Sequence, residues 1–170
     1  MLCDRVLGRW PGDPDGADLV QDPRLDLLDL DWDECHRRAL AKSTRRGRPV
    51  RLLLRLGTTL RHGDVVADAA DCLLVVRVEP AEVLVARPAS AREAAAVALE
   101  WGNLHVPVQI LDDGSLVTLA DGPALGLAAK HGVTVTTEQR RFEPVPISGL
   151  TWTLGGSGLV VATAPTSQRV

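Results

Sequence analysis

The sequence has few aromatic residues and few histidines. Its 170 residues include four Trp, one Phe, no Tyr and only four His. Aromatic rings supply the stacking platforms of nucleic-acid-binding surfaces, and the formal net charge of −3 gives no overall positive field to attract phosphates. Both shortages argue against nucleic acid as a partner.

Cysteines and long hydrophobic runs are also scarce. Cys3, Cys35 and Cys72 are widely spaced and form no CxxC pair, which argues against a disulfide framework and a zinc ribbon and indicates reduced thiols. No apolar run approaches the ~20 residues of a membrane helix. Residues 1–20 contain four Asp instead of the hydrophobic segment of a signal peptide. We therefore expect a cytoplasmic protein without a membrane partner.

The N-terminal part has the pattern of a small all-β domain. Apolar residues make up 45% of the chain, enough to build a core for one domain or two small ones. Residues 8–24 are dense in Pro, Gly and Asp and predict a loop after a short strand within residues 2–7. Residues 25–78 read as short strands separated by turns, with Val50, Leu52 and Leu54 alternating with their neighbours. We expect residues 1–78 to form this domain.

Residues 81–111 predict a strand, a helix and a second strand. The strand spans 81–87, and Ser90 with Glu93 forms a capping box for the helix that follows it. Gly102 is expected to end this helix, and residues 105–111 are the next strand. The apolar stripe of the helix consists of Ala94, Val97, Ala98 and Trp101.

The remaining elements complete a βαββαβ order. An Asp-Gly turn at 112–114 joins the strand 105–111 to a strand over 115–120. Asp121 begins a second helix, whose expected stripe is Leu125, Ala128 and Ala129, and residues 133–139 form the closing strand. The order is that of ferredoxin-like domains. We predict an α+β protein with a ferredoxin-like domain over residues 79–145 and a flexible tail over 146–170.

His105 is the leading candidate for a metal ligand. In the predicted strand, Val106, Val108 and Ile110 share one face. His105 lies on the other face beside Pro107, which favours a sheet edge or the first residues of a strand. An exposed histidine can meet its symmetry mate across a two-fold axis, and two neutral imidazoles suit nickel, copper or zinc. Alternatively, His105 caps the preceding helix or hydrogen-bonds a carbonyl. The spacing alone leaves both interpretations open.

The other candidates have ordinary structural explanations. His62 precedes a turn, and His131 lies in the last turn of a helix, where its charge is favourable. His36 is adjacent to Cys35, but neighbours in a strand point to opposite faces, so this pair is a weak metal candidate. The sequence offers no nucleophile with a nearby base and no HExxH motif, so we expect no enzyme.

Several motifs together resemble one known family. In order they are "LDLDWDECHRRA", "LRLGTTLRHGDVV", "VVRVEPAEVLVAR", "GNLHVPVQI" and "FEP" (142–144). This combination, over about residues 2–145, resembles the urease accessory protein UreE, a nickel metallochaperone. The resemblance implies a homodimer in which His105 and its symmetry mate bind one Ni²⁺ as cargo, with zinc or copper competing. It also implies delivery to the accessory GTPase UreG and, through it, to the urease apoprotein complex.

The sequence departs from the family pattern around this site. Many members carry histidines ahead of the second helix of the metal domain and in the tail, whereas residues 118–125 and 146–170 contain none. Leu104 replaces an arginine that is common there. The remaining nickel ligands would be water, the partner GTPase or an oxygen ligand such as Asp121. The alternative function is a scaffold that docks other urease accessory proteins through the β domain and stores no metal.

Overall fold

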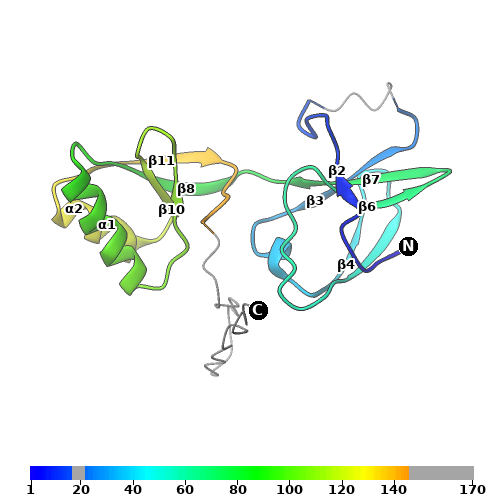
Figure 1. The fold of residues 1–170 in the computed structure, drawn as a ribbon, viewed down its shortest axis with the longest axis horizontal. Helices are drawn as coiled ribbons and strands as arrows, with labels where there is room; N and C mark the ends of the chain where they lie inside the picture. Colours follow the sequence, from blue (N-terminus) through cyan, green and yellow to red (C-terminus); the bar gives the residue numbers. More distant parts are fainter. Residues whose placement is uncertain (17–21, 146–170) are drawn as a thin grey trace, which may run out of the picture.

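The protein is an α+β chain whose regular elements form two lobes (Figure 1). The computed structural model describes residues 1–16 and 22–145. The β lobe contains the strands between residues 2 and 78, and the helical lobe contains the elements between residues 81 and 140. In the described part of the chain, no helix is long and apolar enough to cross a membrane. The tail expected at 146–170 lies outside the described residues.

Two sheets enclose the core of the β lobe. One has the order β1-β5-β4 and the other the order β2-β6-β7-β3. The predicted alternation holds in β5, where Val50 and Leu52 are buried while Arg51 and Leu53 are exposed. The strands are β1 (Leu2–Cys3), β2 (Gly8–Arg9), β3 (Leu25–Leu30), β4 (Ala39–Ser43), β5 (Pro49–Leu53), β6 (Asp64–Ala69) and β7 (Cys72–Val78). A short 3-10 turn, η1, spans Glu34–His36.

Sequence reasoning predicted this lobe well except at its N-terminus. The strand expected within residues 2–7 is limited to Leu2–Cys3. The predicted loop over 8–24 begins with strand β2, whose Gly8 pairs with Val65 of β6. Backbone pairing with a neighbouring strand overrides the local loop composition at this point, because β6 offers a free edge for Gly8 and Arg9.

The helical lobe has the predicted order of elements. They are β8 (Ala81–Arg87), α1 (Ala91–Asn103), β9 (Gln109–Ile110), β10 (Leu116–Leu119), α2 (Gly122–Lys130) and β11 (Thr134–Arg140). The sheet order is β11-β8-β10-β9, and each neighbouring pair is antiparallel. Both helices cover one face of this sheet, and Trp101 is the largest side chain buried between them and the strands (Figure 1). Its indole N–H donates to the carbonyl of Ala124 at 2.9 Å.

The helix signals were correct in kind but not in every residue. The hydroxyl of Ser90 accepts from the N–H of Glu93 at 3.2 Å, but the Glu93 carboxylate accepts from Ala89 instead of from Ser90. In α2, Ala128 is buried as predicted, whereas Leu125 is 43% exposed and Ala129 is also exposed; Ala124 is buried instead. The buried stripe of this short helix therefore starts one residue earlier than we expected.

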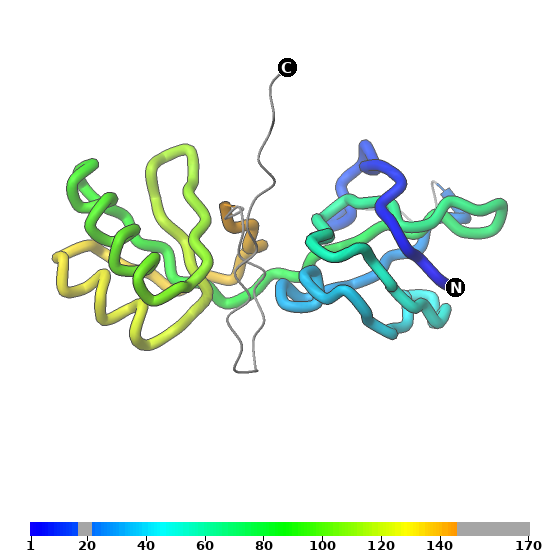
Figure 2. Tube along the Cα trace, turned by 60° about the horizontal axis from the view of Figure 1, so that its bottom comes forward, coloured from blue at the N-terminus to red at the C-terminus, as the bar shows by residue number. Residues whose placement is uncertain are grey.

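The opposite face of the helical lobe's sheet packs against the β lobe. Trp32, which follows β3, and Phe142, which follows β11, form a hydrophobic cluster with Val83, Val85 and Val117. The rings of Trp32 and Phe142 lie 5.5 Å apart at 56°. Among the described residues, the chain passes from the β lobe to the helical lobe where β7 leads into β8 (Figures 1 and 2). This aromatic pair therefore connects the lobes in addition to the covalent link.

Candidate functional site

His105 lies in the turn that ends helix α1, not in a strand. The predicted strand over 105–111 is wrong at its start, because only Gln109–Ile110 form β9. The N–H of His105 donates to the carbonyl of Gly102 at 2.9 Å, and the N–H of Val106 donates to the carbonyl of Trp101 at 3.2 Å. These two hydrogen bonds are the Schellman pattern of a helix C-terminus.

The position of His105 in this pattern is one that favours glycine. Its φ is +57°, and within the described residues it is the only non-glycine residue with positive φ. The left-handed conformation costs an ordinary L-residue about 1–2 kcal/mol, although histidine enters it more often than most. The helix ends past Gly102, so the glycine that we expected to stop it occupies a helical position instead. The backbone at this position does not favour histidine over glycine, so the presence of histidine there points to a role of its side chain.

The imidazole of His105 is exposed. It has no hydrogen-bond partner in residues 1–16 and 22–145, so it does not cap α1 through its side chain. Around it in the chain are exposed apolar residues: Leu104 is 38% exposed, Leu99 66% and Ile110 59%. An exposed imidazole among apolar side chains is a suitable centre for contact with another molecule.

The loop that carries His105 is held on both sides. The hydroxyl of Thr118 donates to the carbonyl of Pro107 at 2.8 Å. On the other side, the N–H of Val145 donates to the carbonyl of Val108 at 2.9 Å. Val106 and Val108 pack against the helix-covered core, as predicted, whereas Ile110 is exposed and does not share their face. The edge position predicted from Pro107 agrees with β9, which is the edge strand of the sheet.

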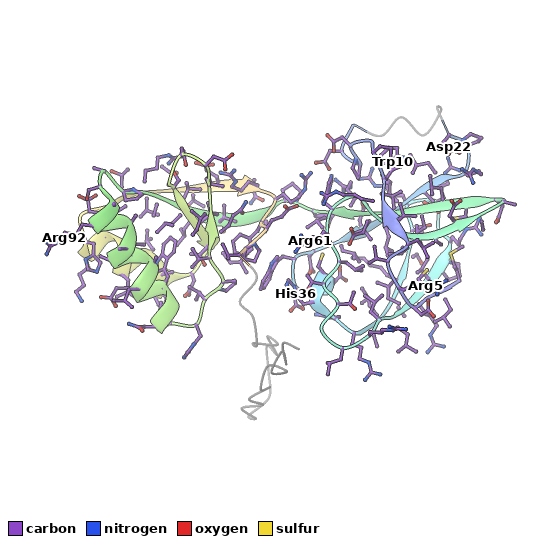
Figure 3. The ribbon with its side chains drawn as sticks, viewed as in Figure 1. Arg5, Trp10, Asp22, His36, Arg61 and Arg92 are labelled. Carbon is purple, nitrogen blue, oxygen red and sulfur yellow. The ribbon has the colours of Figure 1, made fainter. Side chains whose placement is uncertain are left out.

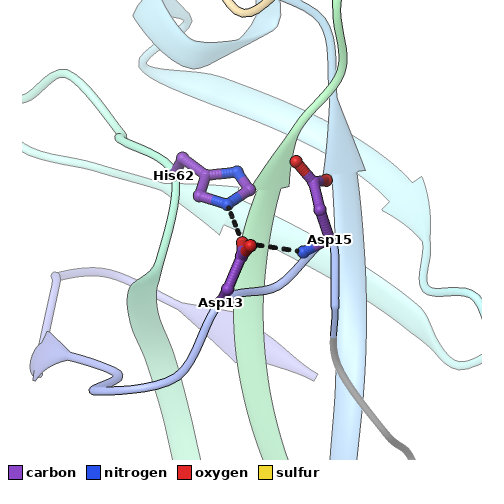
Figure 4. A group of neighbouring side chains, drawn as sticks. All are labelled: Asp13, Asp15 and His62. Atoms are coloured by element: carbon purple, nitrogen blue, oxygen red, sulfur yellow. Dashed lines mark hydrogen bonds and ion pairs between the residues drawn. The ribbon is translucent and has the colours of Figure 1, made fainter.

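A second group of candidate ligands lies in the β lobe (Figure 4). Asp13, Asp15 and His62 bring ligand atoms within 4.8 Å of one another, and no other such group occurs in the described ranges. His62 is buried between the N-terminal loop and β7. Its Nε2 lies 3.2 Å from Asp13 Oδ1, and its Nδ1 accepts from the N–H of Val78 at 3.3 Å. Sequence reasoning missed this group, because Asp13 and His62 are 49 residues apart and no local pattern links them.

The hydrogen bonds of this group oppose metal binding. Because Nδ1 of His62 accepts a hydrogen bond from the N–H of Val78, the hydrogen of the neutral ring is on Nε2, which donates to Asp13. A metal ion needs the lone pair that this tautomer does not offer at Nε2. Asp15 binds Arg141 and also Arg77, whose Nη1 lies 3.4 Å away. The group therefore attaches the loop 13–15 to the β lobe and to Arg141 of the helical lobe.

The electrostatics of the group agree with this structural role. The backbone N–H of Asp15, followed by His62, lowers the pKa of the Asp13 carboxyl below its ordinary value. Asp13 is thus an ionised acceptor that completes the hydrogen bonding of a buried imidazole. Two arginines near Asp15 supply the positive charge that a metal ion would otherwise bring.

The remaining histidines have structural partners. His36 Nδ1 lies 2.8 Å from the carbonyl of Trp32, and its ring packs on the Trp32 indole with centroids 4.6 Å apart. His36 lies on the side of the β lobe that faces the helical lobe (Figure 3). His131 follows α2, and its Nε2 lies 3.3 Å from Glu100 Oε1. These contacts agree with the expected weakness of the Cys35–His36 pair as a metal site, but the strand that we expected there is wrong, because both residues lie in η1.

The cysteines are not prepared for metal binding. All three are buried as free thiols. Burial raises the pKa of the Cys35 thiol to about 12 and also raises the pKa of Cys3 and Cys72. A metal ligand must be a thiolate, which these environments disfavour. The prediction of reduced thiols is consistent with this geometry.

A cavity of about 310 Å³ lies in the β lobe beside the turn between β4 and β5. It is lined by Arg24, Arg46 and Arg48 together with Asp26, Gly47, Asp71 and Cys72. The guanidinium of Arg24 binds Asp22 and Asp68, and that of Arg48 binds Asp71 at 3.0 Å. These ion pairs of Arg24 and Arg48 hold the β6–β7 hairpin, so the residues around the cavity have a structural role.

Comparison with known proteins identifies the family. Residues 6–79 match the family model of the N-terminal domain of the UreE urease accessory protein. Urease accessory protein UreE of Halalkalibacterium halodurans is 30% identical over 119 residues, which cover 70% of this chain and 79% of that protein. The chain belongs to the UreE family.

Other UreE proteins are similar over different lengths. UreE of Actinobacillus pleuropneumoniae is 35% identical over 101 residues, which are 59% of this chain and 53% of that relative. The match thus spans about half the length of that protein. UreE of Lysinibacillus sphaericus is 24% identical over 143 residues, which are 84% of this chain and 93% of that protein. The names of these UreE relatives describe an accessory protein of urease.

Proposed function

We propose that the chain binds nickel through His105 at the interface of a homodimer and delivers it for urease maturation. The observation that carries this proposal is the φ of +57° at His105, where glycine would avoid strain. The strained turn presents an exposed imidazole at the end of a rigid helix, next to a loop fixed by Thr118 and Val145. A preorganised ligand on rigid elements is what a metal site requires.

A two-fold interface completes the proposed site. Exposed Leu99, Leu104 and Ile110 provide apolar surface in the neighbourhood of His105. In an isologous dimer the same patch covers itself, so two His105 imidazoles meet near the axis. Asp121, the N-cap of α2, is exposed and makes no capping hydrogen bond, which supports it as an additional oxygen ligand. Water or the partner completes the coordination, and such an incomplete protein ligand set suits release of the ion.

The rest of the proposal concerns organisation and partners. The β lobe and the helical lobe correspond to domains 1–78 and 79–145, and the antiparallel order β11-β8-β10-β9 supports a ferredoxin-like fold for the second. We propose a cytoplasmic homodimer that transfers Ni²⁺ to the GTPase UreG and through it to the urease apoprotein complex. Copper and zinc compete at an imidazole pair, so selectivity comes from the partner and from metal availability.

Calorimetric nickel titration tests the site. The wild-type chain should bind one nickel ion per dimer, and His105→Ala should lose this binding while light scattering still reports a dimer. The matched control is His131→Ala, which removes an imidazole engaged with Glu100 and should retain the nickel stoichiometry. Unchanged binding by His105→Ala would refute the assignment.

The alternative is a scaffold that docks urease accessory proteins through the β domain with little metal binding. It is favoured by the absence of any group of three metal-ligand atoms around His105 among the described residues. The scaffold function predicts that urease activation in cells is the same with His105→Ala as with the wild type. Loss of activation in that variant, with the fold intact by circular dichroism, would favour nickel delivery.

A further inference from the structure

The outer face of the three-stranded sheet is exposed and carries both leucine and arginine. Side chains alternate between the two faces of a strand, so Arg51 and Leu53 point away from the core that buries Val50 and Leu52. Pairing places Leu2 of β1 beside Arg51. On the other side of β5, Ala41 pairs with Arg51 and Ala39 pairs with Leu53. We call this the outer face: Leu2, Ala39, Ala41, Arg51 and Leu53.

The apolar side chains of the outer face are unusually accessible. Leu2 is 66% exposed and Leu53 51%, and Leu56, a few residues beyond β5, is 78% exposed. Single exposed leucines are common, but here neighbouring strands present them together. Small Ala39 and Ala41 leave the backbone of the adjacent edge strand β4 uncovered. The face therefore offers a partner exposed apolar side chains and a free strand edge.

Arg51 on the outer face and Arg55, two residues beyond β5, lack the ion pairs that other arginines of the β lobe form. Arg24, Arg45 and Arg77 each form ion pairs with carboxylates. Arg51 and Arg55 are exposed and form no ion pair in the part of the chain that the structure describes. Asp4, which follows β1, also forms no ion pair there. The two guanidinium groups outnumber the single carboxylate of Asp4, so the charge on and next to the outer face is positive.

We propose that the outer face is a docking surface for an acidic region of a partner protein. Carboxylates of the partner meet Arg51 and Arg55, and its apolar side chains cover Leu2 and Leu53. Arginine and apolar groups together are typical of protein interfaces, and complementary charge raises the rate of association and selects the partner. The N-terminus, and with it β1, lies on the side of the β lobe turned away from the helical lobe, so docking leaves His105 accessible (Figures 1 and 2).

This inference rests on the proposed function only for its choice of probes, the purified GTPase UreG and the purified urease apoprotein complex. Binding of each probe to the full chain is measured by interferometry at low and at high salt. Arg51→Glu should weaken binding of at least one probe by about tenfold or more and reduce its salt dependence. Leu53→Ser should weaken the same interaction, since it removes apolar contact without changing charge.

Matched controls separate docking from general charge and from folding. Arg92→Glu makes the same charge change at the start of α1, at the far end of the helical lobe, and should leave binding unchanged (Figure 3). Leu7→Ser removes a leucine that is 48% exposed elsewhere in the β lobe. Thermal unfolding and nickel stoichiometry of all variants should match the wild type.

The docking surface and the nickel site can fail separately. The docking surface would be overturned if Arg51→Glu and Leu53→Ser both bound the probes as tightly as the wild type does. It would also be overturned if the wild type bound neither probe. Binding only to vesicles that contain phosphatidylserine would also overturn it, because the partner would then be a membrane. If the wild type bound no nickel, the proposed function would be refuted and the docking result would still stand.

Discussion

The ring of Phe142 packs on the indole of Trp32 at 5.5 Å and thereby joins the two lobes of the molecule. Trp32 is only 7% exposed, and its indole N–H has no hydrogen-bond partner in the described residues. The side chain therefore contributes through apolar contact with the sheet of the helical lobe and not through its polar atom. It also contacts His36, whose ring lies 4.6 Å from the indole at an angle of 54°.

Truncation of Trp32 should separate the lobes. We expect Trp32→Ala to lower the free energy of unfolding by about 3–5 kcal/mol, because a large buried side chain leaves a cavity. Trp32→Phe should cost less, since it retains aromatic contact and removes an unsatisfied donor. Urea unfolding followed by circular dichroism measures both effects. Equal stability of the alanine variant and the wild type would contradict the packing role.

The variants His105→Gly and His105→Ala should differ in stability but not in nickel binding. His105→Gly relieves the left-handed strain, so it should be more stable than His105→Ala by up to about 1 kcal/mol. Both variants should lose nickel binding. The comparison is made by urea denaturation together with calorimetry, and an alanine variant as stable as the glycine variant would indicate an unstrained turn.

Nickel affinity should depend on pH. Protonated imidazole cannot bind metal, so binding should weaken as the pH falls from about 8 to about 5. Titrations at several pH values in a buffer that does not bind nickel measure this. An affinity that stays constant across this range would show that histidine is not the ligand.

Acid should remove the stabilisation that Asp29 provides. Burial raises the pKa of the Asp29 carboxyl, but hydrogen bonds from Arg77 and Arg45, both at 2.7 Å, outweigh it and hold that pKa below its ordinary value. A carboxyl whose pKa is lowered by folding stabilises the protein above its unfolded pKa, and this is lost as the pH falls through the folded value. The wild type should therefore lose this contribution below about pH 4.

The matched variant is Asp29→Asn. At neutral pH it should cost about 1–3 kcal/mol, because hydrogen bonds to charged groups are lost. The difference between variant and wild type should shrink in acid, as measured by thermal unfolding across pH. A difference that does not change with pH would show that the carboxylate charge is unimportant.

The Asp13 group should not contribute to nickel binding. Asp13→Asn should leave the nickel stoichiometry unchanged, since the Nε2 of His62 is a donor in the folded protein. The same variant should loosen the N-terminal loop, which hydrogen exchange at Asp15 would detect. A lower nickel stoichiometry in Asp13→Asn than in the wild type would show that this group binds metal and that the tautomer of His62 changes on binding.

Sequence patterns predicted elements better than their ends. The alternation in β5, the capping by Ser90 and the Asp-Gly turn before β10 depend on local chemistry, so they could be identified without a structure. The end of α1 could not, because Gly102 is an acceptable helix residue and the left-handed position falls at His105 instead. Sequence identified His105 as a candidate but placed it on a strand face.

Long-range pairs were beyond sequence reasoning. The contacts of His62 with Asp13 and of Arg141 with Asp15 join segments far apart in the chain, and single-residue patterns do not encode such distances. The same is true of Trp32 and Phe142, each of which could equally have been buried within its own lobe. Interactions of this kind depend on how whole elements pack.

The hydrogen bond from Val145 to Val108 has a practical consequence for experiments on this protein. It holds Val145, the last residue that the structure describes, beside the loop that carries His105. Anything fused after Val170 is tethered to that point, so its effective concentration at the site is set by the tether and not by dilution. A polyhistidine purification tag at the C-terminus would supply imidazoles to the candidate site and imitate the ligands that this sequence lacks. Nickel measurements should therefore use a chain whose tag is placed at the N-terminus and removed.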